Sequence, residues 1–270
     1  MTHAGLIALS MLIVALAGCA ATPEPHVCSG AVGVDTEPAQ PAWNDQTPIG
    51  RIVTEQPETA RIFDLIGIDY CCGGDTPLGE AATERNLNVN RLLGALAVVG
   101  GEPANEHVRN WDHASVDELI DHIVDVYHAE LRIVLPRLDE VIATVVEVHR
   151  DEHPELVDVQ RVFRALRTEM EEHLALEEDH AFPAIRRLAA GKPVDDVQTV
   201  IDVLYDDHDE AAEALQTLHT LTNGYTPPTG ACNLYRQMLT GLDRLEQQTM
   251  AHIHLENNVL FPRARAALTQ

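Results

Sequence analysis

The residues best suited to chemistry are a histidine and a glutamate four positions apart, which occur twice in the same context. The segments "EEHLALEEDHAFPAI" and "MAHIHLENNVLFPRA" both read H-x-x-x-E, with Phe-Pro beginning five positions after the glutamate. His173 and Glu177 match His252 and Glu256 at an offset of 79 residues. Residues i and i+4 of a helix are about 40° apart around its axis, so each pair presents an imidazole beside a carboxylate.

A lone histidine precedes each pair by about 45 residues. "YHAEL" with His128 and "DHDEA" with His208 lie 80 residues apart. The chain therefore repeats a unit of two helices, and each unit offers one lone histidine and one H-x-x-x-E pair. A single such pair on an acidic helix is usually a solvated side-chain pair, but two in register within a repeat indicate a shared site.

If the two units face each other, four imidazoles and two carboxylates converge. This donor set suits two metal ions bridged by the glutamates, and mixed nitrogen and oxygen ligation favours iron over zinc or magnesium. We therefore predict two non-haem iron ions held by six residues: His128, His173, Glu177, His208, His252 and Glu256. Glu169 lies one turn before His173 and either assists near the metals, handling protons, or is a solvated helix position.

The segment "IDYCCGGDT" places two adjacent cysteines, Cys71 and Cys72, in a chain with five. Neighbouring cysteines strain any disulfide between them, and two thiols alone are a poor zinc site. Asp75 or Thr76, followed by Pro77, predicts a helix start just after the pair, and the helix dipole is expected to favour thiolate over thiol. We expect the pair to act in redox chemistry or as a transient iron ligand.

Long helices are expected to position the histidines and glutamates. Apolar periodicity and glycine- and proline-rich breaks place four of them at about residues 116–148, 155–190, 195–223 and 231–268. Their connections predict an all-α, antiparallel four-helix bundle over residues 106–270. Residues 47–105, which contain the cysteine pair, are expected to form a small helical domain before it.

Residues 1–19 look like a lipoprotein signal. An apolar run at 4–17 ends in "LAGC", which is similar to a bacterial lipobox with Cys19 as the lipid-modified residue. No Lys or Arg precedes the run, and it is too short to span a bilayer comfortably. We predict an envelope lipoprotein held to the membrane only through Cys19, with cytoplasmic residence as the alternative, and residues 20–46 as a flexible tether.

The charge balance is strongly acidic. Asp and Glu number 43 against 18 Lys and Arg, which gives a formal net charge of −25. This charge repels phosphate backbones, so nucleic acid is not an expected partner. The 14 histidines are the more useful excess, because imidazole is the commonest metal ligand. A bundle with a separate small domain also allows a homodimer.

Four segments together resemble the bacterial iron–sulfur cluster repair di-iron proteins, over about residues 47–267: "GIDYCCGG", "EEHLALEEDHAFP", "DDHDEA" and "HIHLENNVLFPRA". The resemblance implies a Cys-Cys domain joined to a hemerythrin-like bundle with a non-haem di-iron centre. It implies a cytoplasmic protein that helps to restore iron–sulfur clusters damaged by oxidative or nitrosative stress. It also assigns the iron to the same six residues that the repeat selects.

Three functions follow as hypotheses. The first is iron delivery to damaged or apo iron–sulfur proteins, with the cysteine thiols as electron donors or transient ligands. The second is an enzyme that reduces nitric oxide, oxygen or peroxide at two ferrous ions with open positions. The third is an oxygen-binding sensor of the hemerythrin type, which leaves the cysteine pair without a role.

Overall fold

The computed structural model describes residues 43–100 and 111–269. The elements in these ranges are helices, with no β-strand, so the predicted all-α class is confirmed. None of the helices in the same ranges combines the length and the apolar character needed to cross a membrane. The predictions for residues 1–19, for Cys19 and for most of the 20–46 tether fall outside the described residues.

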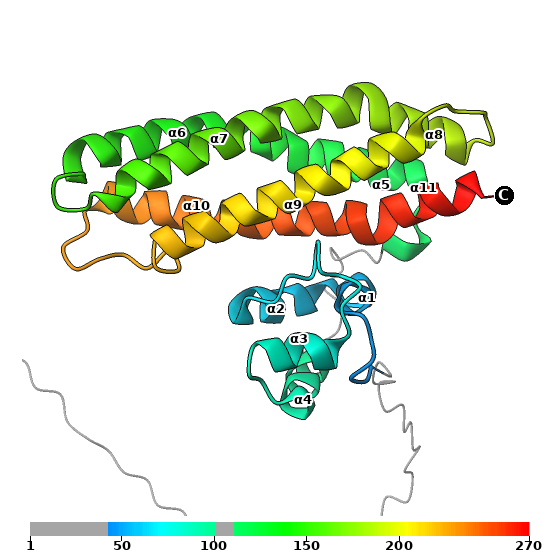
Figure 1. Cartoon of the computed structure of the whole chain (residues 1–270), viewed down its shortest axis with the longest axis horizontal. Helices are drawn as coiled ribbons and strands as arrows, with labels where there is room; N and C mark the ends of the chain where they lie inside the picture. Colours follow the sequence, from blue (N-terminus) through cyan, green and yellow to red (C-terminus); the bar gives the residue numbers. More distant parts are fainter. Residues whose placement is uncertain (1–42, 101–110, 270) are drawn as a thin grey trace, which may run out of the picture. The chain divides into compact units, whose positions relative to one another are not determined.

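Four long helices lie side by side in the bundle (Figure 1): α6 (Ala129–His149), α7 (Glu155–Leu176), α9 (Val197–Leu221) and α10 (Asn233–Leu255). Helix α6 packs against α7 and α10, and α9 packs against the same two helices, so the four enclose a common interior. Three shorter helices continue the bundle: α5 (Val116–His122), α8 (Phe182–Ala189) and α11 (Phe261–Leu268).

Wide π-helical turns join these short helices to the long ones, at Ile123–His128, Glu177–Ala181 and Glu256–Leu260. Three of the four predicted helices are therefore each two helices with a π turn between them. Two of the turns come just before Phe-Pro, where Pro183 and Pro262 lack an N–H and would clash with the carbonyl four residues earlier in a regular helix. The wider turn relieves this conflict, and such turns are frequent at functional sites.

Two apolar clusters fill the bundle, one on each side of a polar layer. The first is built on the long helices and includes Leu131, Met170 and Leu215, whereas the second gathers α5, α8 and α11 against the start of α9 and includes Ile123 and Phe182. Each helix passes from one cluster to the other at its predicted histidine. The apolar packing on both sides therefore fixes the height at which the polar side chains meet.

The small helical part consists of four helices: α1 (Ile49–Glu55), α2 (Ala60–Ile66), α3 (Leu78–Glu84) and α4 (Val89–Gly100). It has its own core, in which Ile52, Phe63 and Leu78 are fully buried. Gly67 ends α2 in the left-handed conformation, at φ 66°, which a glycine adopts without strain. The chain between α2 and α3 carries the two cysteines.

Candidate metal centre

The polar layer contains all six residues that the repeat selects, and they form two groups of four. One group is His128, His252, Glu177 and Glu256, and the other is His173, His208, Glu177 and Glu256; within each group the potential ligand atoms lie within 4.8 Å of one another. The two glutamates belong to both groups. Each group joins one lone histidine with one H-x-x-x-E histidine from the other half of the repeat.

The Nε2 atoms of the four histidines face one another in pairs, beside the two buried carboxylates. The Nε2 atoms of His128 and His252 are 3.1 Å apart, and those of His173 and His208 are also 3.1 Å apart. Both oxygens of Glu177 and Oε2 of Glu256 are buried and meet no hydrogen-bond donor within the described ranges. Such an arrangement of lone pairs is costly unless cations lie between them, so the residues fit metal ions well.

Three of the four imidazoles are oriented by a hydrogen bond at their other nitrogen. Nδ1 of His128 donates to Glu178, at 2.7 Å, and Nδ1 of His173 donates to Asp207, at 3.2 Å. Nδ1 of His208 donates to the side-chain oxygen of Asn257, at 2.8 Å. An Nδ1–H fixes the tautomer in which Nε2 keeps its lone pair, which is the form that binds a metal.

Burial favours the neutral form of two of the histidines, His128 and His173. It lowers the pKa of His128 to about 4, with the neighbouring His252 acting in the same direction. Burial likewise lowers the pKa of His173. His128 and His173 therefore do not need to lose a proton at neutral pH before they bind a cation.

The two buried glutamates have opposite protonation tendencies. Burial, together with the nearby Glu256, raises the pKa of Glu177 well above its ordinary value. Burial also acts to raise the pKa of Glu256, but His252 and His208 hold it well below the ordinary value. Without a cation the pair therefore tends to share one proton, and a cation between the two carboxylates can replace that proton.

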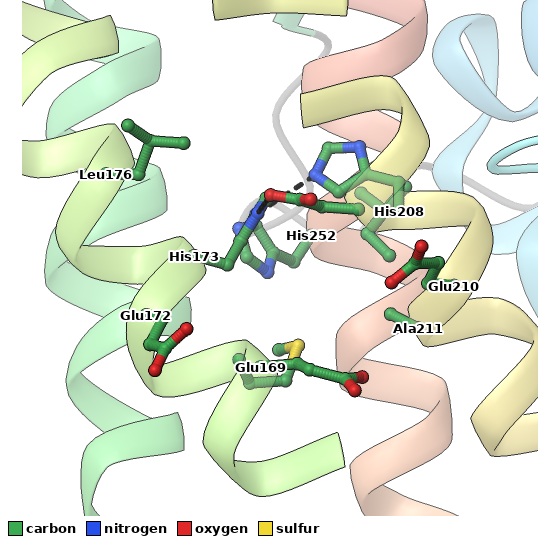
Figure 2. Close-up of a pocket in the computed structure, with 11 residues that line it drawn as sticks. Glu169, Glu172, His173, Leu176, His208, Glu210, Ala211 and His252 are labelled. Carbon is green, nitrogen blue, oxygen red and sulfur yellow. Dashed lines mark hydrogen bonds and ion pairs between the residues drawn. The ribbon is translucent and has the colours of Figure 1, made fainter. Parts of the chain in front are cut away.

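A pocket of about 320 Å³ leads to this site, and His173, His208 and His252 form part of its lining. Figure 2 shows the rings of His173 and His208 pointing toward each other, with the carboxylates of Glu169 and Glu210 near the same pocket. Glu169 is exposed and belongs to neither group of four. The structure thus places Glu169 at the pocket and not among the converging donors.

The cysteine pair lies beside the same layer. The Sγ atoms of Cys71 and Cys72 are 3.7 Å apart and are not bonded to each other. Oδ1 of Asp69 accepts hydrogen bonds from both backbone N–H groups, at 3.0 and 2.9 Å. Sγ of Cys72 lies 3.7 Å from the carbonyl oxygen of His208, so this thiol contacts a residue of the polar layer.

The expected lowering of the thiol pKa is wrong for Cys71. The hydrogen bond with Cys72, then burial, then the charge of Asp69 raise the pKa of Cys71 well above its ordinary value. Helix α3 begins only at Leu78, and the dipole of a helix acts mainly within its first turn. Cys71 is therefore a buried thiol, whereas Cys72 is partly exposed.

Two adjacent asparagines in the π turn that begins at Glu256 contact the cysteine segment. Asn257 holds His208 and also donates toward Sγ of Cys72, at 4.0 Å. Asn258 donates to the carbonyl of Cys71, at 2.9 Å. A single turn that begins at Glu256 thus supplies a potential ligand, orients a histidine and holds the cysteine backbone.

Two protein-family models and several curated proteins match this chain. Residues 119–264 match the hemerythrin HHE cation binding domain, and residues 45–99 match a domain of unknown function, DUF542 (ScdA_N). Iron-sulfur cluster repair protein ScdA of Staphylococcus haemolyticus (strain JCSC1435) is 35% identical over 80% of this chain and 97% of its own. Iron-sulfur cluster repair protein YtfE of Escherichia coli O157:H7 is 35% identical over 83% of this chain and 99% of its own.

The chain belongs to this family of iron-sulfur cluster repair proteins. The resemblance drawn from the sequence is thereby confirmed, as is the hemerythrin-like character of the bundle. A domain that binds cations also agrees with the orphaned carboxylate oxygens and facing imidazoles of the polar layer.

Sequence reasoning missed the residues that orient the histidines in this family member. Glu178 follows Glu177 directly, Asp207 precedes His208 directly, and Asn257 follows Glu256 directly. On a helix such neighbours point away from the ligand beside them, toward a different helix. The signal that could have found them is therefore a polar residue adjacent to each predicted ligand.

Close backbone approach at Gly74 is required for Asn258 to reach the cysteine segment. A Cβ atom at Gly74 would lie 2.0 Å from Oδ1 of Asn258. We expect Gly74→Ala to displace this amide, to lower the free energy of unfolding by about 1 kcal/mol and to speed alkylation of Cys72. Denaturant unfolding and thiol labelling measure both effects.

The matched control is Gly94→Ala in α4, where a new Cβ meets nothing within 4 Å. It is expected to leave thiol labelling unchanged and to raise stability by about 0.5–1 kcal/mol, since alanine is the better helix former. Equal labelling rates for the two alanine variants would contradict the role of Asn258.

Proposed function

We propose that this chain repairs damaged iron–sulfur clusters, and that it does so by supplying iron from the six residues of the polar layer. The curated relatives named iron-sulfur cluster repair proteins support the repair function. The observation that supports iron supply is that two buried groups of four residues share Glu177 and Glu256. Imidazole and carboxylate ligation without thiolate suits an iron ion that is to be given away.

Different residues of the chain would hold the iron and release it. Glu178, Asp207 and Asn257 keep three imidazoles aimed at the centre. We propose that each group of four would hold one ion, so that Glu177 and Glu256 would serve both ions. Bound there, ferrous iron supplies the cargo that a damaged cluster lacks.

The pocket beside His173 offers a way out for that cargo. Glu169, Glu172, Asp207 and Glu210 all line it, so a departing cation meets carboxylate oxygens along the way. Oxygen ligands exchange more readily than a closed cage of thiolates. We propose that Glu169 acts here, as a transient partner of a cation or a proton.

The cysteine pair is proposed to receive iron transiently or to supply electrons. Asp69, Cys71 and Cys72 offer one ligand atom each within 4.8 Å of one another. Cys72 and Asp69 both line a cleft of about 1000 Å³, so this group is open to a docked acceptor. The setting that we propose is oxidative or nitrosative stress, which damages such clusters.

A second candidate function is the reduction of nitric oxide, oxygen or peroxide at the same site. The observation that favours it is the pocket of about 320 Å³, which reaches three of the four histidines and admits a diatomic molecule. The two functions differ in the fate of the metal. A donor loses iron, whereas a reductase keeps it through turnover.

Iron transfer to an apo iron–sulfur protein tests the proposal. Under anaerobic conditions the iron-loaded chain is expected to lose iron while the acceptor gains a cluster, given sulfide and a reductant. Cys71→Ala, Cys72→Ala protein should keep its bound iron and transfer it several-fold more slowly. Metal analysis of both proteins after separation gives the readout.

The control variant is Cys232→Ala, which removes an exposed thiol at the start of α10. It should transfer iron at the wild-type rate. Iron that stays in the chain while nitric oxide is consumed would support the second candidate instead. A double cysteine variant that repairs clusters at the wild-type rate would contradict the proposed role of the pair.

A further inference from the structure

Aromatic rings lie against three of the four histidines of the polar layer, and they differ in chemistry. Phe182 stacks on His128, with ring centroids 5.7 Å apart, and Phe261 stacks on His208 at 5.9 Å. Tyr127 stacks on His252 at 5.8 Å, with an angle of 13° between the planes. A phenylalanine ring resists oxidation, whereas a phenol gives up an electron together with its proton.

From Tyr127 the row of rings continues outward. The ring of His122 lies 5.5 Å from that of Tyr127, and the ring of Trp111 stacks on His122 at 4.2 Å. Trp111 is partly exposed. A cavity of about 320 Å³ is lined by Trp111, His122 and Tyr127 together, which leaves room for water to carry a proton between the outer two.

On the opposite side of the layer, the residues within 43–100 and 111–269 form no such row. Tyr205 lies 5.4 Å from Phe261, which in turn lies against His208. A phenylalanine therefore separates this tyrosine from the nearest histidine. Among the residues that the structure describes, Tyr127 is the oxidisable ring stacked directly on a proposed metal ligand.

We infer that Tyr127 and Trp111, with His122 between them, form a route by which an oxidising equivalent leaves the metal centre and reaches the protein surface. The inference goes beyond iron supply and rests on the metal-binding part of the proposed function. The route of aromatic rings is protective, because an oxidising equivalent that stays at the metal centre attacks the nearest imidazoles. The oxidant is a peroxide molecule that reaches a metal centre with one ferrous and one ferric ion.

The proposed reaction reduces one molecule of hydrogen peroxide with two electrons. A ferrous ion held by the polar layer would supply hydrogen peroxide with one electron and become ferric, and the phenol of Tyr127 would supply the second electron together with its proton. One further proton from solvent completes two water molecules, so the O–O bond breaks and a tyrosyl radical forms. The indole N–H of Trp111 then returns an electron and a proton to Tyr127, and the radical is now on Trp111.

A low-molecular-weight thiol ends the sequence at the surface. It gives a hydrogen atom to Trp111, and two thiyl radicals combine into a disulfide. The side chains of Tyr127 and Trp111 are thereby restored, the iron remains ferric, and the thiol is oxidised in place of a metal ligand. His122 keeps its electrons throughout and serves as the ring that bridges Tyr127 and Trp111.

Freeze-quench electron paramagnetic resonance and peptide mass spectrometry test the route. Iron-loaded protein with one ferrous and one ferric ion per chain is mixed with hydrogen peroxide in the absence of thiol. The wild type is expected to show a tyrosyl radical and then oxidised Trp111. Trp43, the other tryptophan of the chain, is the internal reference and is expected to stay unmodified.

Three variants, each with phenylalanine in place of an oxidisable ring, test which residues form the route. Tyr127→Phe, with its iron content verified, is expected to lose the radical and the oxidation of Trp111, and to acquire oxidised histidines with release of iron. Trp111→Phe should prolong the tyrosyl radical. Tyr205→Phe, the matched control, should keep the wild-type radical signal.

Two results would overturn the inference. One is a Tyr127→Phe protein with the wild-type radical yield and the wild-type oxidation of Trp111. The other is a wild-type protein in which Trp111 is modified no more than Trp43. Iron transfer to the acceptor is measured on the same samples, so a chain that shows the radical but fails to repair clusters separates the failure of the proposed function from that of the route.

Discussion

The Glu177→Gln, Glu256→Gln double variant is expected to purify without its metal ions while it keeps the helical fold. Both glutamates belong to both groups of four, so the double change removes every carboxylate from the two sites and leaves two imidazoles in each. Two neutral nitrogen donors hold a divalent ion far more weakly than a set that includes carboxylates. Metal analysis after iron loading, with circular dichroism for the fold, measures the effect.

The same variant is expected to unfold at a higher denaturant concentration than the metal-free wild type. Glu177 and Glu256 are fully buried, and three of their four oxygens meet no hydrogen-bond donor within the described ranges. An amide carries no charge to desolvate, so we expect a gain of roughly 1–4 kcal/mol in the free energy of unfolding. The metal-loaded wild type should exceed both, because bound metal stabilises the folded state.

A double change on the surface provides the control. Glu140 and Glu171 are exposed, and Glu140→Gln, Glu171→Gln alters the net charge by the same amount. This protein should bind metal as the wild type does. A Glu177→Gln, Glu256→Gln protein that keeps the wild-type metal content would remove the basis for placing the cations between these two carboxylates.

The internal repeat made the bundle and its six polar residues predictable. Apolar periodicity reports which face of a helix is buried, and the constant offset reports which polar residues of that face belong together. The repeat does not report pairing, because His128 meets His252 and His173 meets His208 only once the four helices are packed.

The π turns and the asparagines could not be predicted in the same way. Phe-Pro after Glu177 and Glu256 indicates a wide turn, but the turn at Ile123–His128 is not followed by Phe-Pro, so this signal does not predict it. Asn258 contacts the backbone of residues almost 190 positions earlier, which no local pattern reports. Cys71 is likewise buried in the apolar cluster of the long helices, and this burial opposes the local preference for a thiolate.

Asp64→Asn is expected to stabilise the protein at pH 7.5 and to lose that advantage as the pH falls to 4. Burial raises the pKa of Asp64 to about 6, and the charges of Glu246 and Asp243 act in the same direction, although a hydrogen bond from Tyr70 opposes them. An unfolded aspartate has a pKa near 3.9, so between about pH 4 and 6 the folded state holds the proton that the unfolded state has lost. Stability therefore falls as the pH rises through this window, and the cost is fully present above it.

Urea unfolding at several pH values measures this cost, which we expect to reach about 1–2 kcal/mol once screening by water around the partly exposed carboxylate is allowed for. Asp151→Asn, at an exposed position, leaves Asp64 in place and should keep the pH dependence of the wild type. Asp64, Asp243 and Glu246 line the same cleft as Cys72, so a carboxylate that weakens the fold lies in the cleft where the cysteine pair is proposed to meet an acceptor. An Asp64→Asn protein that is more stable but slower in iron transfer would show that this cost serves the function. Equal transfer rates would leave Asp64 as a destabilising residue without a part in iron supply.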